Sequence, residues 1–276
     1  MIGPFVDSAW VAEHLSEVVP ADVRWYLDGR SGRKAYERAH VPGAVFVDLD
    51  TVLAAPATAA QGRHPLPEPG RFAAGLGGLG IGGDDAVIAY DDAGGVIAAR
   101  LVWMLRATGH EAAVLDGGID AWSGPLEAGP SARSAADFAT HTWPGELLAS
   151  IDEVAETTDV LLDARDRERY SGAFEPVDPR GGHIPGALSF PCRENLGPDG
   201  RLVSVEELRA RLDALGIDGG TPVISSCGSG VTACHNLLVL EHAGMRPGRL
   251  YPGSWSQWSA DPTRPAATGA AADPAG

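Results

Sequence analysis

The feature that most constrains the fold of this chain is an internal repeat. The run Leu27-Asp28-Gly29-Arg30 precedes a His-Val-Pro-Gly-Ala motif, and the run Leu162-Asp163-Ala164-Arg165 precedes a His-Ile-Pro-Gly-Ala motif. Two further landmarks, a β-rich segment and a Gly…Trp pair, recur in the same order at an offset near 135 residues. That period is too long for a solenoid, so the sequence predicts two tandem copies of one domain.

Each copy alternates short apolar runs with amphipathic helical segments. In the second copy we expect strands at 160–162, 188–190, 222–226 and 249–251, and helices at 205–215 and 231–242. The first copy repeats this order, with strands at 23–27, 45–47, 86–90 and 113–115 and helices at 71–77 and 96–108. The alternation predicts an α/β fold in which each domain has a mainly parallel sheet with helices on both faces. The ligand site of such a sheet lies at the carboxyl ends of its strands.

The length of 276 residues suits two domains. We expect an N-terminal domain at 1–124, a linker at 125–145, a C-terminal domain at 146–260 and a flexible tail at 261–276. The linker is rich in Pro, Gly, Ser and Ala and lacks periodicity, and the tail is a low-complexity Ala/Pro/Gly segment.

Charge and composition exclude several classes of function. The net charge of −16 opposes binding to nucleic acid or to an anionic lipid surface. No apolar run approaches 18 residues and the N-terminus lacks the pattern of a signal peptide, so we expect a cytoplasmic location. Three cysteines are too few, and odd in number, for a disulfide framework.

The most informative stretch runs from Ser225 to Ala233 and reads Ser-Ser-Cys-Gly-Ser-Gly-Val-Thr-Ala. A predicted strand leads into Cys227 and a glycine loop that opens a helix. We expect the N–H groups of this loop to turn inward as an anion site, to which the helix N-terminus adds partial positive charge. Both effects favour a Cys227 thiolate nucleophile. A buried structural cysteine is the alternative, but it does not require such a loop. The loop residues expected to contact the substrate are Gly228, Gly230, Val231 and Thr232.

A tyrosine-phosphatase-like site is a second alternative. Such enzymes place an arginine six positions after the nucleophilic cysteine to clamp phosphate. Ala233 occupies that position here, and the loop is too short, so the sequence disfavours a phosphatase.

These motifs resemble the rhodanese superfamily of sulfurtransferases, in particular its tandem two-domain members of the 3-mercaptopyruvate and thiosulfate type. The resemblance runs from about Phe5 to Trp258 and includes the Cys227 loop, both His-x-Pro-Gly-Ala turns and the Tyr-Pro-Gly-Ser-Trp motif from Tyr251. It implies transfer of a sulfane sulfur through a Cys227 persulfide, with no metal or organic cofactor. It also implies a catalytically inactive N-terminal domain, because Asp91 stands where the repeat aligns with Cys227.

The resemblance also bears on the sulfur donor. Thiosulfate-preferring members resemble Cys-Arg-Lys-Gly-Val-Thr, whereas mercaptopyruvate-preferring members resemble the Cys-Gly-Ser-Gly-Val-Thr found here. The family binds the mercaptopyruvate carboxylate with two upstream arginines, which implies substrate-binding roles for Arg169 and Arg180. The spacing between these two arginines is about two residues longer than the common pattern.

Mercaptopyruvate-type members further share a Ser–His–Asp relay. By resemblance its members here are Ser229, His64 and Asp50, with the last two contributed by the first copy. A serine hydroxyl bonded to a histidine can move a proton to the departing enolate, while the aspartate fixes the histidine tautomer.

The expected partners are therefore a small anionic donor and a thiol, cyanide or thioredoxin-like acceptor. Two alternatives stay open. One is a thiosulfate-preferring sulfurtransferase that uses cyanide as acceptor, and the other is a persulfide carrier that receives its sulfur from another protein.

Overall fold

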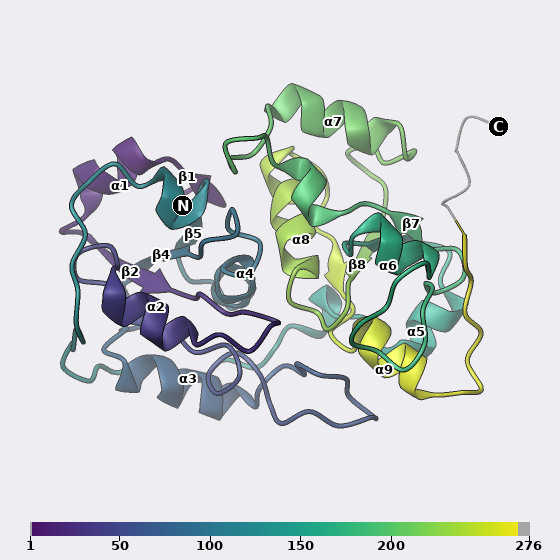
Figure 1. The fold of residues 1–276 in the computed structure, drawn as a ribbon, viewed down its shortest axis with the longest axis horizontal. Coiled ribbons are helices and arrows are strands. Elements are labelled where there is room, and N and C mark those ends of the chain that lie inside the picture. The colour runs from purple at the N-terminus through teal and green to yellow at the C-terminus, as the bar shows by residue number, and fades with distance from the viewer. Residues whose placement is uncertain (1, 270–276) are drawn as a thin grey trace. The chain divides into compact units, whose positions relative to one another are not determined.

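The computed structural model describes residues 2–269, which divide into two compact units (Figure 1). The first unit comprises residues up to 55, 66–144 and 196–202. The second comprises 56–65, 145–195 and the residues from 203 onward. The short segment 56–65 therefore belongs with the second unit, although it lies in the first half of the sequence.

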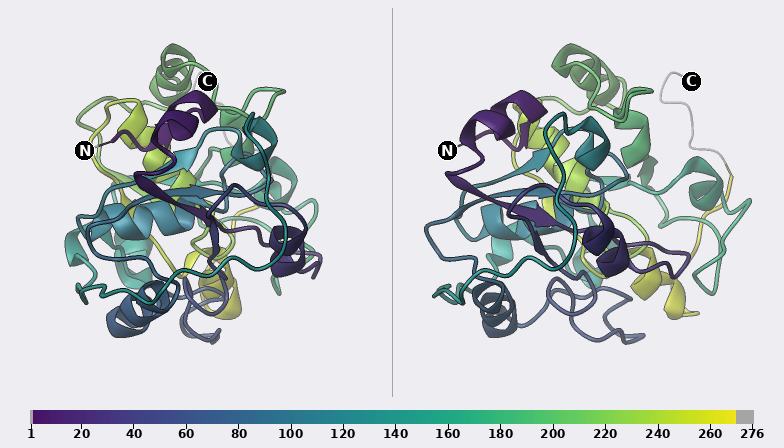
Figure 2. Two further views of the ribbon diagram at one scale, coloured as in Figure 1. Left: turned by 90° about the vertical axis from the view of Figure 1, so that its left-hand side faces the viewer. Right: turned by 60° about the vertical axis from the view of Figure 1, so that its left-hand side comes forward.

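The first unit is built on a five-stranded parallel sheet of order β1-β5-β4-β2-β3. Its strands are β1 (Phe5–Val6), β2 (Val18–Asp22), β3 (Val45–Phe46), β4 (Ala86–Tyr90) and β5 (Ala112–Leu115). Its helices are α1 (Ser8–His14), α2 (Gly32–Arg38), α3 (Pro69–Gly78) and α4 (Ala99–Ala107), with a 3₁₀ turn η1 (Gly118–Ala121). In both views of Figure 2, α1 lies on one side of this sheet and α4 on the other.

Strand β4 shows why the sheet is covered on both faces. Ile88 and Tyr90 pack in a cluster with Val11 of α1, while the alternate residues Val87 and Ala89 are also buried. Because successive side chains of a strand point to opposite faces, burial of all four requires helices on both sides.

The second unit has a four-stranded parallel sheet of order β7-β6-β8-β9. Its strands are β6 (Val160–Asp163), β7 (Leu188–Ser189), β8 (Val223–Ser226) and β9 (Arg249–Leu250). Its helices are α5 (Ile151–Glu156), α6 (Arg167–Ser171), α7 (Val205–Asp213), α8 (Ala233–His242) and α9 (Ser254–Ala260), with 3₁₀ turns η2 (Gly145–Leu147) and η3 (Cys192–Asn195). The predicted α/β class with two parallel sheets is confirmed.

Local chemistry explains where α7 begins and what it buries. The side chain of Ser204 accepts a hydrogen bond from the N–H of Glu207, which satisfies a donor that the first turn leaves unpaired. Leu208 and Leu212, one turn apart, form its buried face.

The His-x-Pro-Gly-Ala turns hold the same contacts in both units. Tyr170 stacks on His183 with ring centroids 3.7 Å apart, and its hydroxyl donates to the carbonyl of Ala187 at 2.6 Å. Tyr36 likewise stacks on His40 at 4.2 Å and donates to Ala44 at 2.8 Å. These histidines serve the fold, because the first unit repeats the contacts without a cysteine at its loop.

The alignment of Asp28 with Asp163 is wrong. Asp163 is buried at the end of β6 and pairs with Arg165 two residues on, with Nη2 and Oδ2 2.6 Å apart. In the first unit Asp22 makes this pair with Arg24 at the end of β2, at 2.5 Å. The predicted strand at 23–27 is correspondingly displaced to 18–22. Asp28 is exposed and pairs with the exposed Arg30. The alignment was wrong because the same Leu-Asp-x-Arg pattern falls in a surface turn in the first unit and on a buried ion pair in the second.

The predicted linker and the described part of the predicted tail both make contacts with the units that they follow. The linker packs along the first unit, where Phe138 contacts Phe72 and the Trp143 indole donates to the Pro67 carbonyl at 2.8 Å. Residues 261–269 pack on the second unit, where Ala267 forms a β-bridge with His183. These contacts join residues that are distant in sequence, and composition alone does not predict them. Residues 270–276 of the predicted tail lie outside the described residues.

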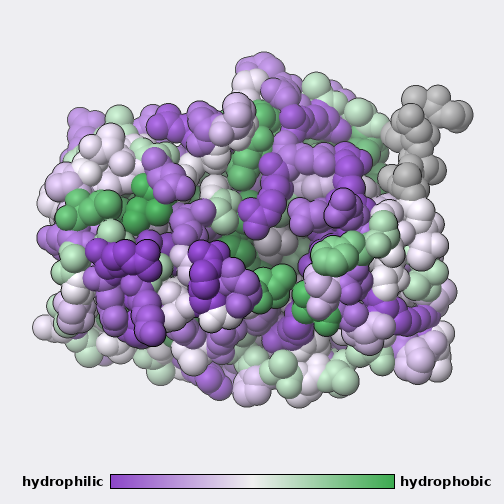
Figure 3. All heavy atoms as spheres, in the orientation of Figure 1, coloured by the Kyte–Doolittle hydropathy of each residue, from purple (hydrophilic) through white to green (hydrophobic). Residues whose placement is uncertain are grey.

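On the face shown in Figure 3, hydrophobic residues appear as scattered patches among polar ones. The large apolar side chains exposed in the described chain are Leu27, Leu126 and Phe174. No helix within residues 2–269 is long and apolar enough to cross a membrane.

Candidate active site

Cys227 lies at the point where β8 ends and the glycine loop begins. Its Sγ accepts hydrogen bonds from the backbone N–H groups of Ser229, at 3.4 Å, and Gly230, at 3.1 Å. Val231 and Thr232 complete the loop, and α8 starts at the next residue, so its N-terminal end lies beside the sulfur. The arrangement favours a negative charge on Sγ, because amide donors and the helix dipole both stabilise an anion.

Gly230 cannot be replaced without moving the loop. Its φ is +77°, and a Cβ atom there would stand 2.5 Å from the carbonyl oxygen of Pro252. The glycine thus permits both the turn toward Sγ and the close approach of the segment before α9.

Ser254 holds the backbone of the cysteine loop in place through its side-chain hydroxyl. It is fully buried and has a φ of +51°, a left-handed conformation that no other non-glycine residue of the described chain adopts. Its hydroxyl donates to the Tyr251 carbonyl at 2.8 Å and accepts from the N–H of Cys227 at 3.1 Å. Backbone strain is therefore held at the residue that positions the nucleophile.

The segment 56–65 is fixed against the start of α9. Gly62 lies so close that a Cβ atom there would stand 2.7 Å from both the Gly253 carbonyl oxygen and Ser256 Oγ. The N–H of Arg63 donates to Ser256 Oγ at 3.0 Å. These contacts determine where the side chains of Arg63 and His64 lie.

His64 and Ser229, predicted members of the relay, are brought together. His64 Nδ1 and Ser229 Oγ lie 2.8 Å apart, and both residues are buried. Asp50 lies in the first unit, where its Oδ2 accepts a hydrogen bond from the Trp25 indole at 3.1 Å. Its role as the partner of His64 stays a prediction.

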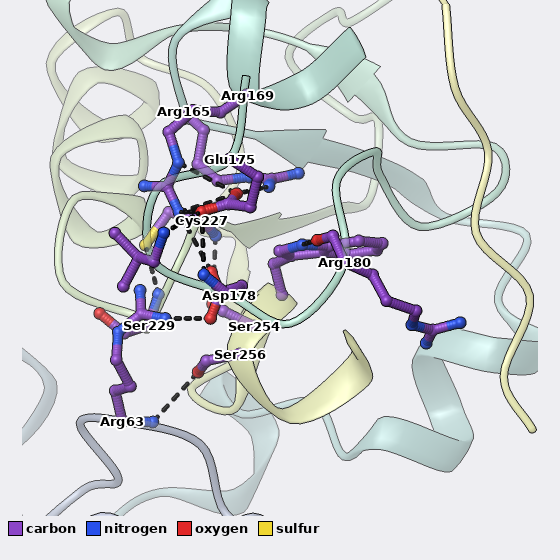
Figure 4. A network of polar contacts seen from close by, with 12 residues as sticks. Arg63, Arg165, Arg169, Glu175, Asp178, Arg180, Cys227, Ser229, Ser254 and Ser256 are labelled. Atoms are coloured by element: carbon purple, nitrogen blue, oxygen red, sulfur yellow. Dashed lines mark hydrogen bonds and ion pairs between the residues drawn. The ribbon is translucent and has the colours of Figure 1, made fainter. Parts of the chain in front are cut away.

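Arg169, a predicted substrate-binding residue, also lies in this region (Figure 4). Its guanidinium donates to Glu175 at 2.8 Å and to Asp178 at 3.1 Å. The side chain keeps 16% exposure, whereas the neighbouring Arg165, held by Asp163 and Glu175, keeps 2%. Arg169 is therefore the more accessible of the two to an anion.

The pKa values of Asp178 and Glu175 shift in opposite directions, although burial opposes the ionisation of both carboxylates. Burial raises the pKa of Asp178 above its ordinary value, opposed by the Arg63 charge and reinforced by that of Glu175. Burial also opposes ionisation of Glu175, but hydrogen bonds from Arg169 and from two backbone N–H groups outweigh it and lower the pKa. Glu175 is thus held as an anion by its own donors.

Arg180, the other predicted substrate-binding residue, contacts a different part of the second unit, and its substrate role stays a prediction. In Figure 4 its guanidinium points away from Cys227. It donates instead to backbone carbonyls at and beyond the end of α9, at 2.9–3.1 Å, which are those of Trp258, Ser259, Asp261 and Arg264. Carbonyls at a helix end lack intrahelical partners, so Arg180 stabilises the fold there.

Sequence reasoning missed Arg63, whose guanidinium lies beside the loop. A Cβ atom on Gly228 would stand 2.9 Å from Arg63 Nη2 and 3.4 Å from Arg169 Nη1. The only sequence signal was its position next to His64.

The other two cysteines do not resemble nucleophiles. Burial raises the pKa of the Cys192 thiol to about 12, so it stays protonated at neutral pH. Cys234 is buried in α8 and its Sγ donates to the Gly230 carbonyl at 3.3 Å. Among the described residues no group of three His, Cys, Asp or Glu side chains is placed to hold a metal ion.

The equivalent loop of the first unit is filled by its own side chain. The buried Asp91 carboxylate accepts four backbone hydrogen bonds of 2.7–2.8 Å, from the N–H groups of Ala93, Gly95, Ile97 and Ala98. A carboxylate held by its own loop cannot attack sulfur, which supports the predicted inactivity of this copy.

The fold and the cysteine loop together match what the sequence predicted for a site of covalent group transfer. The family model of the rhodanese-like domain matches this chain twice, over residues 7–125 and 144–261. The chain therefore belongs to the rhodanese-like domain family and carries that domain in tandem, as predicted.

Several known proteins of similar sequence or structure are named sulfurtransferases. A Pseudomonas aeruginosa protein named "Probable 3-mercaptopyruvate sulfurtransferase" is 42% identical over 94% of this chain and 96% of its own length. A Rattus norvegicus thiosulfate sulfurtransferase is 36% identical over 92% of this chain and 91% of its own. The structure of 3-mercaptopyruvate sulfurtransferase from Leishmania major matches with a TM-score of 0.83 and 34% identity, covering 93% of this chain and 74% of that one.

Proposed function

We propose that this chain is a sulfurtransferase that takes sulfur from 3-mercaptopyruvate onto Cys227 and passes it to a thiophilic acceptor. The enzyme class is confirmed by the named relatives. The observation that carries the choice of donor is the His64–Ser229 pair, 2.8 Å apart, beside a cysteine whose loop holds no cation. A relay of this kind serves a donor whose leaving group must be protonated.

In the first half-reaction the Cys227 thiolate attacks the thiol sulfur of mercaptopyruvate. An S–S bond forms, the C–S bond breaks, and the carbon keeps the electron pair as the enolate of pyruvate. The Ser229 hydroxyl supplies a proton to the enolate and is reprotonated through His64, which gives pyruvate. The N–H groups of Ser229 and Gly230 stabilise the negative charge on the cysteine sulfurs.

In the second half-reaction a thiophile attacks the outer persulfide sulfur and regenerates the Cys227 thiolate. Small thiols, cyanide and thioredoxin-like proteins have this chemistry. The two half-reactions share one covalent intermediate, so ping-pong kinetics are expected.

A thiosulfate-preferring enzyme is the second candidate. The partly exposed guanidinium groups of Arg63 and Arg169 favour it, because they could pair with a dianion. Single-turnover loading followed by intact mass decides between the donors. Cys227 should gain one sulfur atom faster from mercaptopyruvate, Cys227→Ala should gain none, and Cys192→Ala should load as the wild type does. Faster loading from thiosulfate would reverse the preference, and no loading from either donor would indicate a protein-fed carrier.

A further inference from the structure

Arg63 reaches the reaction site from a segment distant in sequence. Its backbone is anchored by Ser256, and its guanidinium lies against Gly228, the residue after the nucleophile. The side chain is 27% exposed, so part of it is open to a ligand. Its Nε is buried and has no hydrogen-bond partner among the described residues, which leaves one directed donor unused.

Asp178 joins Arg63 to Arg169. One carboxylate oxygen pairs with Arg63 Nη1, and the other accepts from Arg169 Nη2 at 3.1 Å. The Asp178 side chain is only 3% exposed, whereas both arginines are partly open. Asp178 therefore orients two guanidinium groups toward Gly228 without itself facing solvent.

The charges in this cluster balance. The three guanidinium groups of Arg63, Arg165 and Arg169 face three carboxylates, which are Asp163, Glu175 and Asp178. The Cys227 thiolate adds one negative charge. A donor with one carboxylate can use the directed N–H groups with little repulsion, but a dianion meets a site whose positive charge is already neutralised.

We infer that Arg63 and Arg169 together bind the carboxylate of the sulfur donor, and that Asp178 sets the preference for a monoanionic donor over a dianionic one. Arg63 thereby takes the place that the sequence assigned to Arg180. The inference rests on the proposed function and names the residues that select its substrate.

The test measures kcat and KM with mercaptopyruvate and with thiosulfate for four variants and the wild type. Arg63→Gln should raise KM for mercaptopyruvate by about 10- to 100-fold with a smaller change in kcat, because it removes charge-assisted hydrogen bonds to the ground state and transition state alike. The KM of Arg63→Lys for mercaptopyruvate should lie between those of the wild type and Arg63→Gln, since lysine keeps the charge but lacks the planar guanidinium with its paired donors. Arg167→Gln, which breaks an exposed pair with Glu194, is the matched control and should behave as wild type.

Asp178→Asn keeps the shape of the side chain and removes its charge. It should raise the thiosulfate-to-mercaptopyruvate ratio of kcat/KM at least about tenfold, because one opposing charge is lost beside the anion. Circular dichroism and the thermal midpoint establish that each variant is folded. An unchanged KM in Arg63→Gln, or an unchanged ratio in folded Asp178→Asn, overturns the inference. Absence of turnover in the wild type instead overturns the proposed function.

Discussion

His64 Nδ1 and Ser229 Oγ lie 2.8 Å apart although the two residues are separated by 165 positions in sequence. The contact exists because the segment 56–65 is anchored on α9, which follows the strand adjacent to the cysteine loop. A hydroxyl held by a buried imidazole is placed to move a proton at the sulfur.

Ser229→Ala and His64→Gln should each lower kcat with mercaptopyruvate by about 100-fold, the scale of general acid–base catalysis. The double variant should be little worse than either single one, since the two residues act as a unit. Turnover with thiosulfate should fall less than about tenfold, because its sulfite leaving group needs no proton. Steady-state kinetics with both donors measure this, and equal losses with both would mean that the pair only supports the loop.

Ser254→Ala should destabilise the protein. It leaves the buried N–H of Cys227 without its hydroxyl acceptor, at a cost of about 1–3 kcal/mol. Ser254→Gly loses the same hydrogen bond but relieves the left-handed backbone at φ +51°, so it should be less destabilising. Urea unfolding of the two variants measures the difference. Greater stability of the alanine variant would show that residue 254 carries no strain.

His235 makes stability depend on pH. Burial lowers its pKa from 6.5 to about 3, so between these values the unfolded chain binds a proton that the folded chain does not. Stability is therefore lost as the pH falls from about 6.5 toward 3.

From pH 7.5 to 5.0 the His235 contribution should fall by about 2 kcal/mol, at 1.36 kcal/mol per pH unit below 6.5. His235→Leu replaces the imidazole with a non-titrating apolar side chain of similar size and should remove this part of the pH dependence. Urea unfolding at the two pH values gives both numbers. An equal decline in the variant would assign the effect to the other titrating groups.

The long elements could be predicted from the sequence because their signals are local. Strand β4 lies where its apolar run predicted it, and α8 begins within two residues of the prediction. The five-residue α6 has too few residues to show a helical period, so the sequence did not predict it. The alignment of Asp28 with Asp163 was wrong because it used residue identity alone. Only the folded chain shows that Asp163 is buried and Asp28 is exposed.

The candidate site likewise has one part that the sequence predicted and another that it did not. Cys227 and its loop form one contiguous motif, so the sequence placed them together. Arg63 meets Asp178 across 115 positions, and nothing local distinguishes either from a surface charge. Arg180 stood in the expected segment, but the carbonyls at the end of α9 offered its guanidinium a better-directed set of partners. The family resemblance predicted the pairing of His64 with Ser229 across the same docked segment, whereas Arg63 belongs to no motif and was therefore not predicted.

The Asp91 carboxylate bears on how much sulfur one molecule can hold. Its four short hydrogen bonds occupy the backbone donors of the loop in the first unit with a side chain that is covalently part of the chain. In the second unit the loop instead donates two backbone hydrogen bonds to Cys227 Sγ, the atom that carries the sulfur in the proposed reaction. If Cys227 carries the sulfur as proposed, we expect one molecule to load a single sulfur atom, because the loop of the first unit is filled by a side chain that cannot leave it.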